Sequence, residues 1–173
     1  MNEPQEQNPT QLMQKRAFVT PAQQSAIEKI ALSLKAKTPA RFILVADRNG
    51  HVLVFSGDGM ANAGMAELAA LLAGDLAASQ EIARLTGAFQ QQQLVLREGE
   101  KQNTFLCEAG SDLVLFMQSD SEVPLGWARL LVLEAGGQLA KMQLSSDEQE
   151  GPMGFNGDGF KQNLDEAIDG LWH

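Results

Sequence analysis

The pattern of apolar positions predicts that the domain begins with a helix. One apolar face repeats at the i, i+3, i+4, i+7 spacing of a helix, at Ile27, Ile30, Ala31 and Leu34. Just before it, Thr20 is placed to cap the helix, Pro21 suits its first position, and Gln23 completes a Thr-x-x-Gln capping box. These signals place the start of the helix at Thr20–Pro21.

Short apolar runs between turn residues predict five strands. They are Arg41–Ala46, His51–Ser56, Gln91–Arg97, Asn103–Glu108 and Leu113–Gln118. Asn49-Gly50 between the first two is a strong hairpin signal. The short connections between the last three predict an antiparallel meander with Gln91–Arg97 at a sheet edge.

Two more helices complete the predicted domain. A long helix lies within Ala61–Thr86, where Gly87 ends it, and a last helix covers Leu125–Leu144. Gly136-Gly137 either weakens this last helix or lets a neighbour approach closely. The order α-β-β-α-β-β-β-α, with hairpins in place of crossovers, predicts an α+β fold: a five-stranded antiparallel sheet with helices on both faces.

The long helix has two unlike apolar sides. The side of large residues is expected to pack on the protein's own sheet: Met65, Leu68, Leu71, Leu72, Leu76 and Ile82. The other side consists of small residues, Ala66, Ala70, Ala73, Gly74 and Ala77, flanked by the charged residues Glu67, Glu81 and Arg84. These short side chains would let the same helix of a second copy approach closely in a two-fold dimer. The alternative is that alanine only serves helix propensity on a solvated face.

Charge favours one register for such a dimer. If the crossing is centred near Asp75–Leu76, Glu67 of one copy meets Arg84 of the other. If it is centred at Gly74, Glu67 faces Glu81 and repels it. We therefore expect the first register.

The predicted edge strand supports the same dimer. It begins with the polar run Gln90–Gln93, and its apolar part starts at Leu94. Exposed strand edges invite pairing with another chain. Edge-to-edge pairing would continue the sheet through the dimer, whereas the alternative is a simply solvated edge.

Composition and charge divide the 173 residues into four parts. The chain carries 13 Lys+Arg and 22 Asp+Glu, a net charge of −9, which argues against non-specific binding to nucleic acid. Residues 1–16 are polar and read as a disordered tail, and residues 17–144 form the domain, with ten basic and 13 acidic residues. Residues 145–159 read as a flexible linker to residues 160–173. Seven acids and one base lie in the acidic extension 145–173.

The last 14 residues regain helical spacing. Their apolar anchors are Phe160, Leu164, Ile168 and Leu171, with Trp172 beside them. So short a helix needs a surface to bind. We expect it to bind a groove on a partner protein, with acidic flanks that steer it toward basic charge. The alternatives are docking on its own domain or on the other copy of a dimer, and plain disorder.

Candidate chemistry is sparse. The single cysteine, Cys107, lies in a predicted strand and is expected in the core, and His51, with no partner nearby in the sequence, is expected at a hairpin end. No phosphate loop, metal-ligand cluster, signal peptide or apolar run of 18 residues is present in the sequence. We therefore expect a cytoplasmic protein that is not an enzyme, needs no cofactor or metal, and does not insert into membranes.

Three stretches together resemble the roadblock family, the dynein light-chain roadblock type and its bacterial and archaeal relatives. They are Arg41–Leu53 with its strand–Asp-x-x-Gly–strand pattern, the Ala/Leu-rich helix from Met60 to Gly87, and Pro124–Arg129 (PLGWAR) at the start of the last helix. The resemblance implies a homodimer built through the second helix and the third strand. It also implies a non-enzymatic platform that binds small Ras-like GTPases, some bacterial members stimulating GTP hydrolysis without an arginine finger. The competing interpretation is a small-molecule sensor module of similar build.

Overall fold

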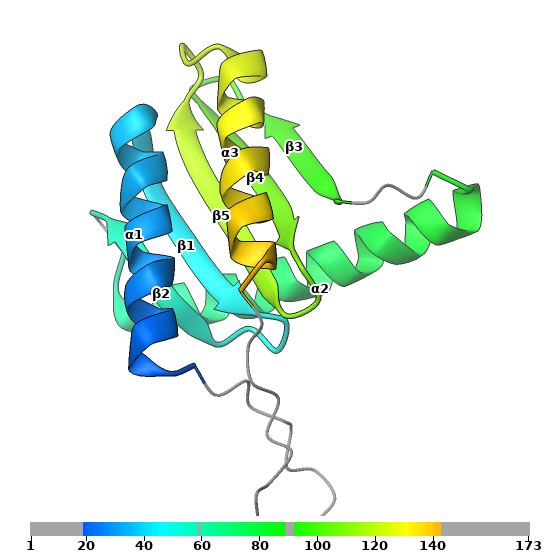
Figure 1. Cartoon of the computed structure of the whole chain (residues 1–173). Coiled ribbons are helices and arrows are strands. Elements are labelled where there is room, and N and C mark those ends of the chain that lie inside the picture. Colours follow the sequence, from blue (N-terminus) through cyan, green and yellow to red (C-terminus); the bar gives the residue numbers. More distant parts are fainter. Residues whose placement is uncertain (1–18, 59, 89–91, 143–173) are drawn as a thin grey trace, which may run out of the picture.

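The computed structural model describes residues 19–58, 60–88 and 92–142 (Figure 1). Its elements follow the predicted order: α1 (Pro21–Lys37), β1 (Ala40–Asp47), β2 (Val52–Gly57), α2 (Asn62–Thr86), β3 (Leu94–Glu98), β4 (Gln102–Ala109), β5 (Leu113–Asp120) and α3 (Leu125–Ala140). The predicted N-terminal tail (1–16), linker (145–159) and C-terminal amphipathic helix (160–173) lie outside the described residues.

The five strands form one antiparallel sheet in the order β2-β1-β5-β4-β3. β1 and β5 therefore pair at the centre, and β3 is an edge strand as predicted. β3 starts at Leu94, where the apolar part of the predicted strand begins, and Gln93 just before it still accepts a hydrogen bond from the Glu108 amide of β4 at 2.8 Å. α3 ends at Ala140, earlier than Leu144.

Local signals set the helix ends. The Thr20–Gln23 capping box forms in both directions: the Thr20 amide donates to Gln23 Oε1 at 2.8 Å, and the Gln23 amide donates to Thr20 Oγ1 at 3.2 Å. At the C-terminal end of α2, Gly87 is the C-cap in the left-handed conformation, with φ of 71°. Both ends were predicted from the sequence.

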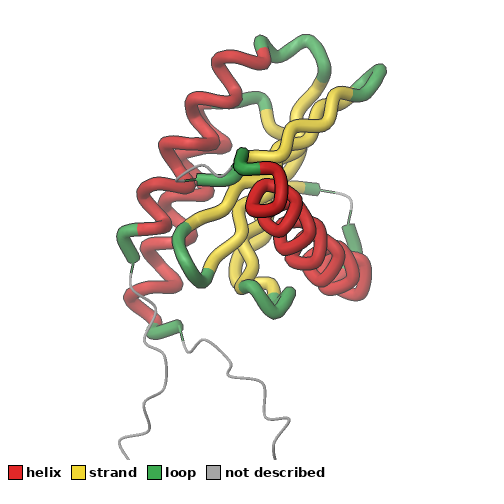
Figure 2. Tube along the Cα trace, turned by 90° about the vertical axis from the view of Figure 1, so that its right-hand side faces the viewer, coloured by secondary structure: helices red, strands yellow, loops and turns green. Residues whose placement is uncertain are grey.

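Helices cover both faces of the sheet (Figure 2). α1 and α3 lie side by side on one face, and α2 crosses the other, where its C-terminal end projects past the sheet (Figure 1). Two apolar layers result. One lies between the sheet and α1 with α3, and includes Ile43, Phe105 and Leu115; the other lies under α2 and includes Leu44 and Leu106.

Two glycines allow close approach between the sheet and its helices. Gly50, in the β1–β2 turn, has φ of 84°, and a Cβ there would lie 2.6 Å from Ala70 Cα of α2. A Cβ on Gly136 of α3 would lie 2.8 Å from the Sγ of Cys107 in β4, whereas one on Gly137 would meet nothing within 4 Å. Gly136 therefore has the packing role that the sequence left open, and Gly137 does not.

Candidate functional site

The outward face of α2 carries three of the six large apolar residues that are exposed in the described part of the chain. Leu71, Ile82 and Leu85 are 66%, 61% and 69% exposed. At about 100° per residue, they form a stripe along one side of the helix. Single exposed apolar residues are ordinary, but a contiguous patch marks an interaction surface.

This exposure corrects the predicted orientation of α2. Leu71 and Ile82 were expected to pack on the sheet, yet they point to solvent. Leu72 and Leu76 of the same predicted side are buried as expected, and Ala69 and Ala83 are buried with them. Two of the four are alanines, which lets α2 lie close to the sheet, and this turns the two large residues outward.

A second, small stripe lies next to the exposed leucines. The predicted interface residues that are exposed are Ala66, Glu67, Ala70, Gly74, Ala77, Glu81 and Arg84, while Ala73 and Leu94 are half-buried. A Cβ on Gly74 would meet nothing within 4 Å. The face defined by Ala70, Leu71, Gly74, Ala77, Ile82 and Leu85, here called the α2 outer face, thus combines small positions with protruding ones. That these residues contact a second copy stays a prediction.

Three of the four charged residues on α2, Asp75, Glu81 and Arg84, are already in ion pairs within the chain. Arg84 binds Glu81 through two hydrogen bonds, Nε to Oε2 at 2.8 Å and Nη2 to Oε1 at 2.5 Å. The hydrogen bond with Arg84 holds the pKa of the Glu81 carboxyl below its usual value, and the reciprocal bond raises the pKa of Arg84. The register centred near Asp75–Leu76 required Arg84 to be available for Glu67 of the other copy. Since Arg84 is engaged, charge no longer chooses between the two registers.

The edge strand β3 is joined to α2 by polar contacts. Arg97 of β3 pairs with Asp75 of α2 at 2.5 Å, and Gln93 Nε2 donates to the carbonyl of Ser79 at 3.5 Å. Both elements implied in self-association therefore belong to one connected side of the molecule.

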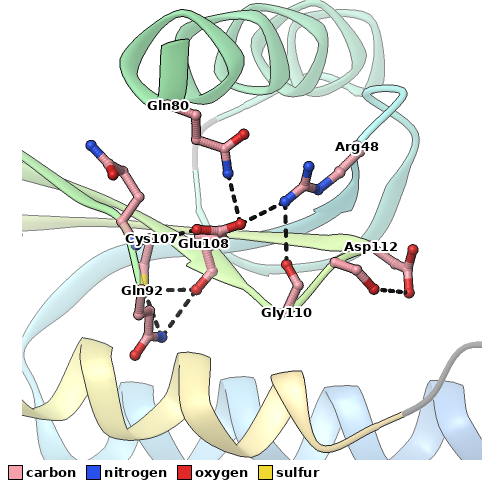
Figure 3. A network of polar contacts seen from close by, with 9 residues as sticks. Arg48, Gln80, Gln92, Cys107, Glu108, Gly110 and Asp112 are labelled. Atoms are coloured by element: carbon pink, nitrogen blue, oxygen red, sulfur yellow. Dashed lines mark hydrogen bonds and ion pairs between the residues drawn. The ribbon is translucent and has the colours of Figure 1, made fainter. Parts of the chain in front are cut away.

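A polar network around Glu108 anchors α2 on its other side (Figure 3). Glu108 Oε1 accepts from Arg48 Nη2 at 2.6 Å and from Gln80 Nε2 at 2.7 Å. Arg48 lies in the β1–β2 turn, Glu108 in β4 and Gln80 in α2, so one carboxylate holds together three elements. The network could not be found from the sequence, because its members are 28 and 60 residues apart and share no motif.

Cys107 is a core residue. It is fully buried, burial raises the pKa of its thiol to about 12, and Gln92 Nε2 donates to its Sγ at 3.2 Å. A thiol with so high a pKa holds almost no thiolate near neutral pH and is a poor nucleophile there.

His51 lies at the hairpin end, as predicted, but it does have a partner nearby in the sequence. Its Nδ1 lies 2.8 Å from Asp47 Oδ2, while Asp47 Oδ1 accepts the backbone amides of Asn49 at 2.9 Å and His51 at 2.8 Å. The expectation of no local partner was therefore wrong. An Asp that opens a tight turn tends to bond the amides that follow it, and this signal was present in Asp47-Arg48-Asn49-Gly50.

The described residues offer little to a small ligand. Residues 19–58, 60–88 and 92–142 contain no group of three or more His, Cys, Asp or Glu side chains placed to hold a metal ion. Over the same ranges, no helix has the length and apolar character needed to cross a membrane. A hollow between α1 and α3, lined by Ile30, Lys37 and Glu134 among others, has a volume of about 10 Å³, which suits one water molecule.

The chain is similar to known proteins in sequence and in fold. The family model of the Roadblock/LC7 domain matches residues 26–119. No curated protein sequence matches the chain. Among solved structures, "MglB with tetrameric arrangement" is similar with a TM-score of 0.62 and 28% identity, over 72% of this chain and 92% of that one.

Two further structures with named sources are similar over the same region. MglB of Myxococcus xanthus has a TM-score of 0.61 and 28% identity, over 68% of this chain and 94% of that one. The gliding protein MglB of Thermus thermophilus has a TM-score of 0.57 and 31% identity, over 67% of this chain and 90% of that one.

Proposed function

Because the chain belongs to the Roadblock/LC7 family, we propose that it is a homodimeric regulator that binds a small Ras-like GTPase and is not itself an enzyme. The observation that carries the proposal is the α2 outer face, a helix surface on which apolar residues are two-thirds exposed beside glycine and alanine. A helix face with this much exposed apolar surface usually packs against another protein surface.

Self-association through α2 fits the shape of this face. A two-fold axis across α2 would set protruding side chains of one copy against small positions of the other; with the crossing centred at Gly74, for example, Leu71 faces Ala77. β3 lies at the sheet edge and is tied to α2 by the Arg97–Asp75 pair. Its pairing with the second copy would continue the sheet in the same assembly.

Regulation would act through the GTPase's own catalytic groups. Four of the five arginines of the described chain are already in ion pairs with acids of the same chain, Arg41, Arg48, Arg84 and Arg97, and the fifth, Arg129, lies on α3 and not on α2. Arg84, the one on α2, is held by two hydrogen bonds. This supports a platform that positions GTPase residues over one that inserts an arginine into the nucleotide site.

The dimer is tested with a matched pair of leucine variants. Leu71 on α2 and Leu130 on α3 are 66% and 62% exposed, both within helices. Leu71→Asp should convert the dimer to a monomer in sedimentation equilibrium at micromolar concentration, while Leu130→Asp should leave it a dimer. A wild-type monomer, or a Leu71→Asp variant that still dimerises, would exclude this interface.

GTPase regulation is tested separately. A Ras-like GTPase from the same cells should bind the wild-type protein when loaded with a GTP analogue, and its single-turnover GTP hydrolysis rate should change in the protein's presence. Leu71→Asp should lose the effect with the dimer. If the rate and the binding are unchanged while the protein is a dimer, the regulatory function is wrong and the dimer stands.

A further inference from the structure

A second unpartnered apolar face lies on the opposite side of the sheet, on α3. Trp127 and Leu130 are 54% and 62% exposed and lie three residues apart, on the same side of the helix. Gly137, seven residues after Leu130, is half-buried and has free space where a Cβ would be. We call these three positions the α3 outer face. In the described residues α3 has α1 beside it and the sheet below it, and its outer side stays uncovered (Figure 2).

We propose that residues 160–173 dock on the α3 outer face of their own chain. The apolar anchors of this segment, Phe160, Leu164, Ile168 and Leu171, follow at i, i+4, i+8 and i+11 and form one stripe when helical. A 14-residue helix is marginal alone in water and gains stability by covering an apolar surface. The α3 outer face runs along the helix from Trp127 to Gly137, which is about the length of helix between the first and last anchors of the segment.

Charge selects this face over the α2 outer face. α1, α3 and the residue that caps α3 carry five basic residues and two acidic ones: Lys29, Lys35, Lys37, Arg129 and Lys141 against Glu28 and Glu134. α2 carries three acidic residues and one basic: Glu67, Asp75, Glu81 and Arg84. Residues 160–173 carry three acids and one base, and the linker 145–159 before them carries four acids and no base. The acidic segment is therefore attracted to the α1/α3 layer and repelled by α2.

The connection to the domain has the length this docking needs. The chain leaves the described region at Met142, directly after α3, and seventeen residues (143–159) precede the segment. A flexible stretch of that length spans about 23 Å. The 16 residues of α3 rise about 24 Å. Every position on α3 is thus within reach, and the tether gives a local concentration on the order of millimolar, so that modest contacts suffice.

Disulfide trapping in the full chain tests the proposal. In a Cys107→Ala background, Leu130→Cys with Ile168→Cys should form a disulfide within one chain under mild oxidation, visible as a monomer of altered mobility on a non-reducing gel. Leu32→Cys with Ile168→Cys is the matched control, because Leu32 is 57% exposed on α1 and belongs to neither the α2 outer face nor the α3 outer face. No bond at position 130, a bond that joins two chains, or equal trapping at position 32 would each overturn the proposal.

Tryptophan fluorescence gives a second, independent readout without oxidation. Trp172→Phe leaves Trp127 as the sole tryptophan, which reports on the α3 outer face. Adding Ile168→Asp should then shift its emission to the red and raise its acrylamide quenching constant about twofold, whereas Gln162→Asp, which adds the same charge off the stripe, should not. Equal quenching in all three proteins means that the segment lies elsewhere, on a second copy or on a partner, and refutes docking on α3.

Discussion

Replacing Gly136 with alanine should destabilise the domain, whereas the same replacement at its neighbour Gly137 should stabilise it. Both glycines lie inside α3, so each change gains roughly 1 kcal/mol of helix propensity. They differ in what the new methyl group meets. At Gly137 it meets nothing within 4 Å, while at Gly136 it would lie 2.8 Å from the buried Sγ of Cys107 and closer still to the Nε2 of Gln92.

The cost at Gly136 follows from these contacts. The Gln92 amide can rotate away, but it then loses its hydrogen bonds to Cys107 Sγ at 3.2 Å and to the Glu108 carbonyl at 3.0 Å, about 0.5–1.5 kcal/mol each. The thiol cannot leave the core, and overpacking of this kind costs about 1–3 kcal/mol. We therefore expect a net loss of about 1–5 kcal/mol for Gly136→Ala, and a gain of about 0.5–1 kcal/mol for Gly137→Ala.

Urea unfolding followed by circular dichroism, at one fixed protein concentration, measures both changes against the wild type. Cys107→Ala removes the Sγ atom, so the Gly136→Ala/Cys107→Ala double variant should lose less stability than the sum of the single variants. If Gly136→Ala unfolds at the same urea concentration as Gly137→Ala, or if the double variant is additive, the close-approach argument is wrong.

Four further predictions concern single positions. Gly87→Ala should cost about 1 kcal/mol, because the left-handed φ of 71° at this C-cap disfavours a side chain; an unchanged thermal midpoint would contradict this. Thr20→Ala should cost about 1 kcal/mol by removing the capping box, measured in the same way. Cys107, whose pKa is about 12, should react with Ellman's reagent at pH 8 about a thousandfold more slowly in the folded protein than after unfolding; rapid labelling of folded protein would refute its burial. Arg84→Gln should raise the pKa of Glu81 toward its ordinary value of 4.5, followed by NMR; because that pKa is lowered in the folded chain, the pair stabilises above about pH 4.5 and is lost as the pH falls through the lowered value.

Features that depend on residues close together in the sequence could be predicted from the sequence. Thr20 and Gln23 are three apart, and Asn49-Gly50 is a dipeptide, so the first helix start and the hairpin could be predicted from local pattern. The same holds for Gly87 at the end of α2. Asp47–His51 was also within local reach, because a side chain that opens a turn bonds the amides after it.

Features that depend on which surfaces meet could not be predicted in the same way. The periodicity of α2 shows two sides, but not which one the sheet selects, and the choice of Ala69 and Ala83 turned Leu71 and Ile82 outward. The Glu108 network joins three distant segments. The small stripe was expected to contact a second copy, which stays a prediction, and the exposure of Leu71 and Ile82 beside it could be found only from the folded structure.

The contact between Gly50 and α2 limits which substitutions this protein can accept during its evolution. Asparagine and aspartate often replace glycine where φ is positive, because their side chains tolerate that conformation. At φ of 84° the hairpin alone would accept either of them. Any Cβ at position 50, however, meets the α2 backbone at 2.6 Å, so variation there would require α2 to shift away from the sheet. This buried turn glycine is thus as restricted as a residue of the apolar core, and α2 limits the substitutions that the hairpin can accept.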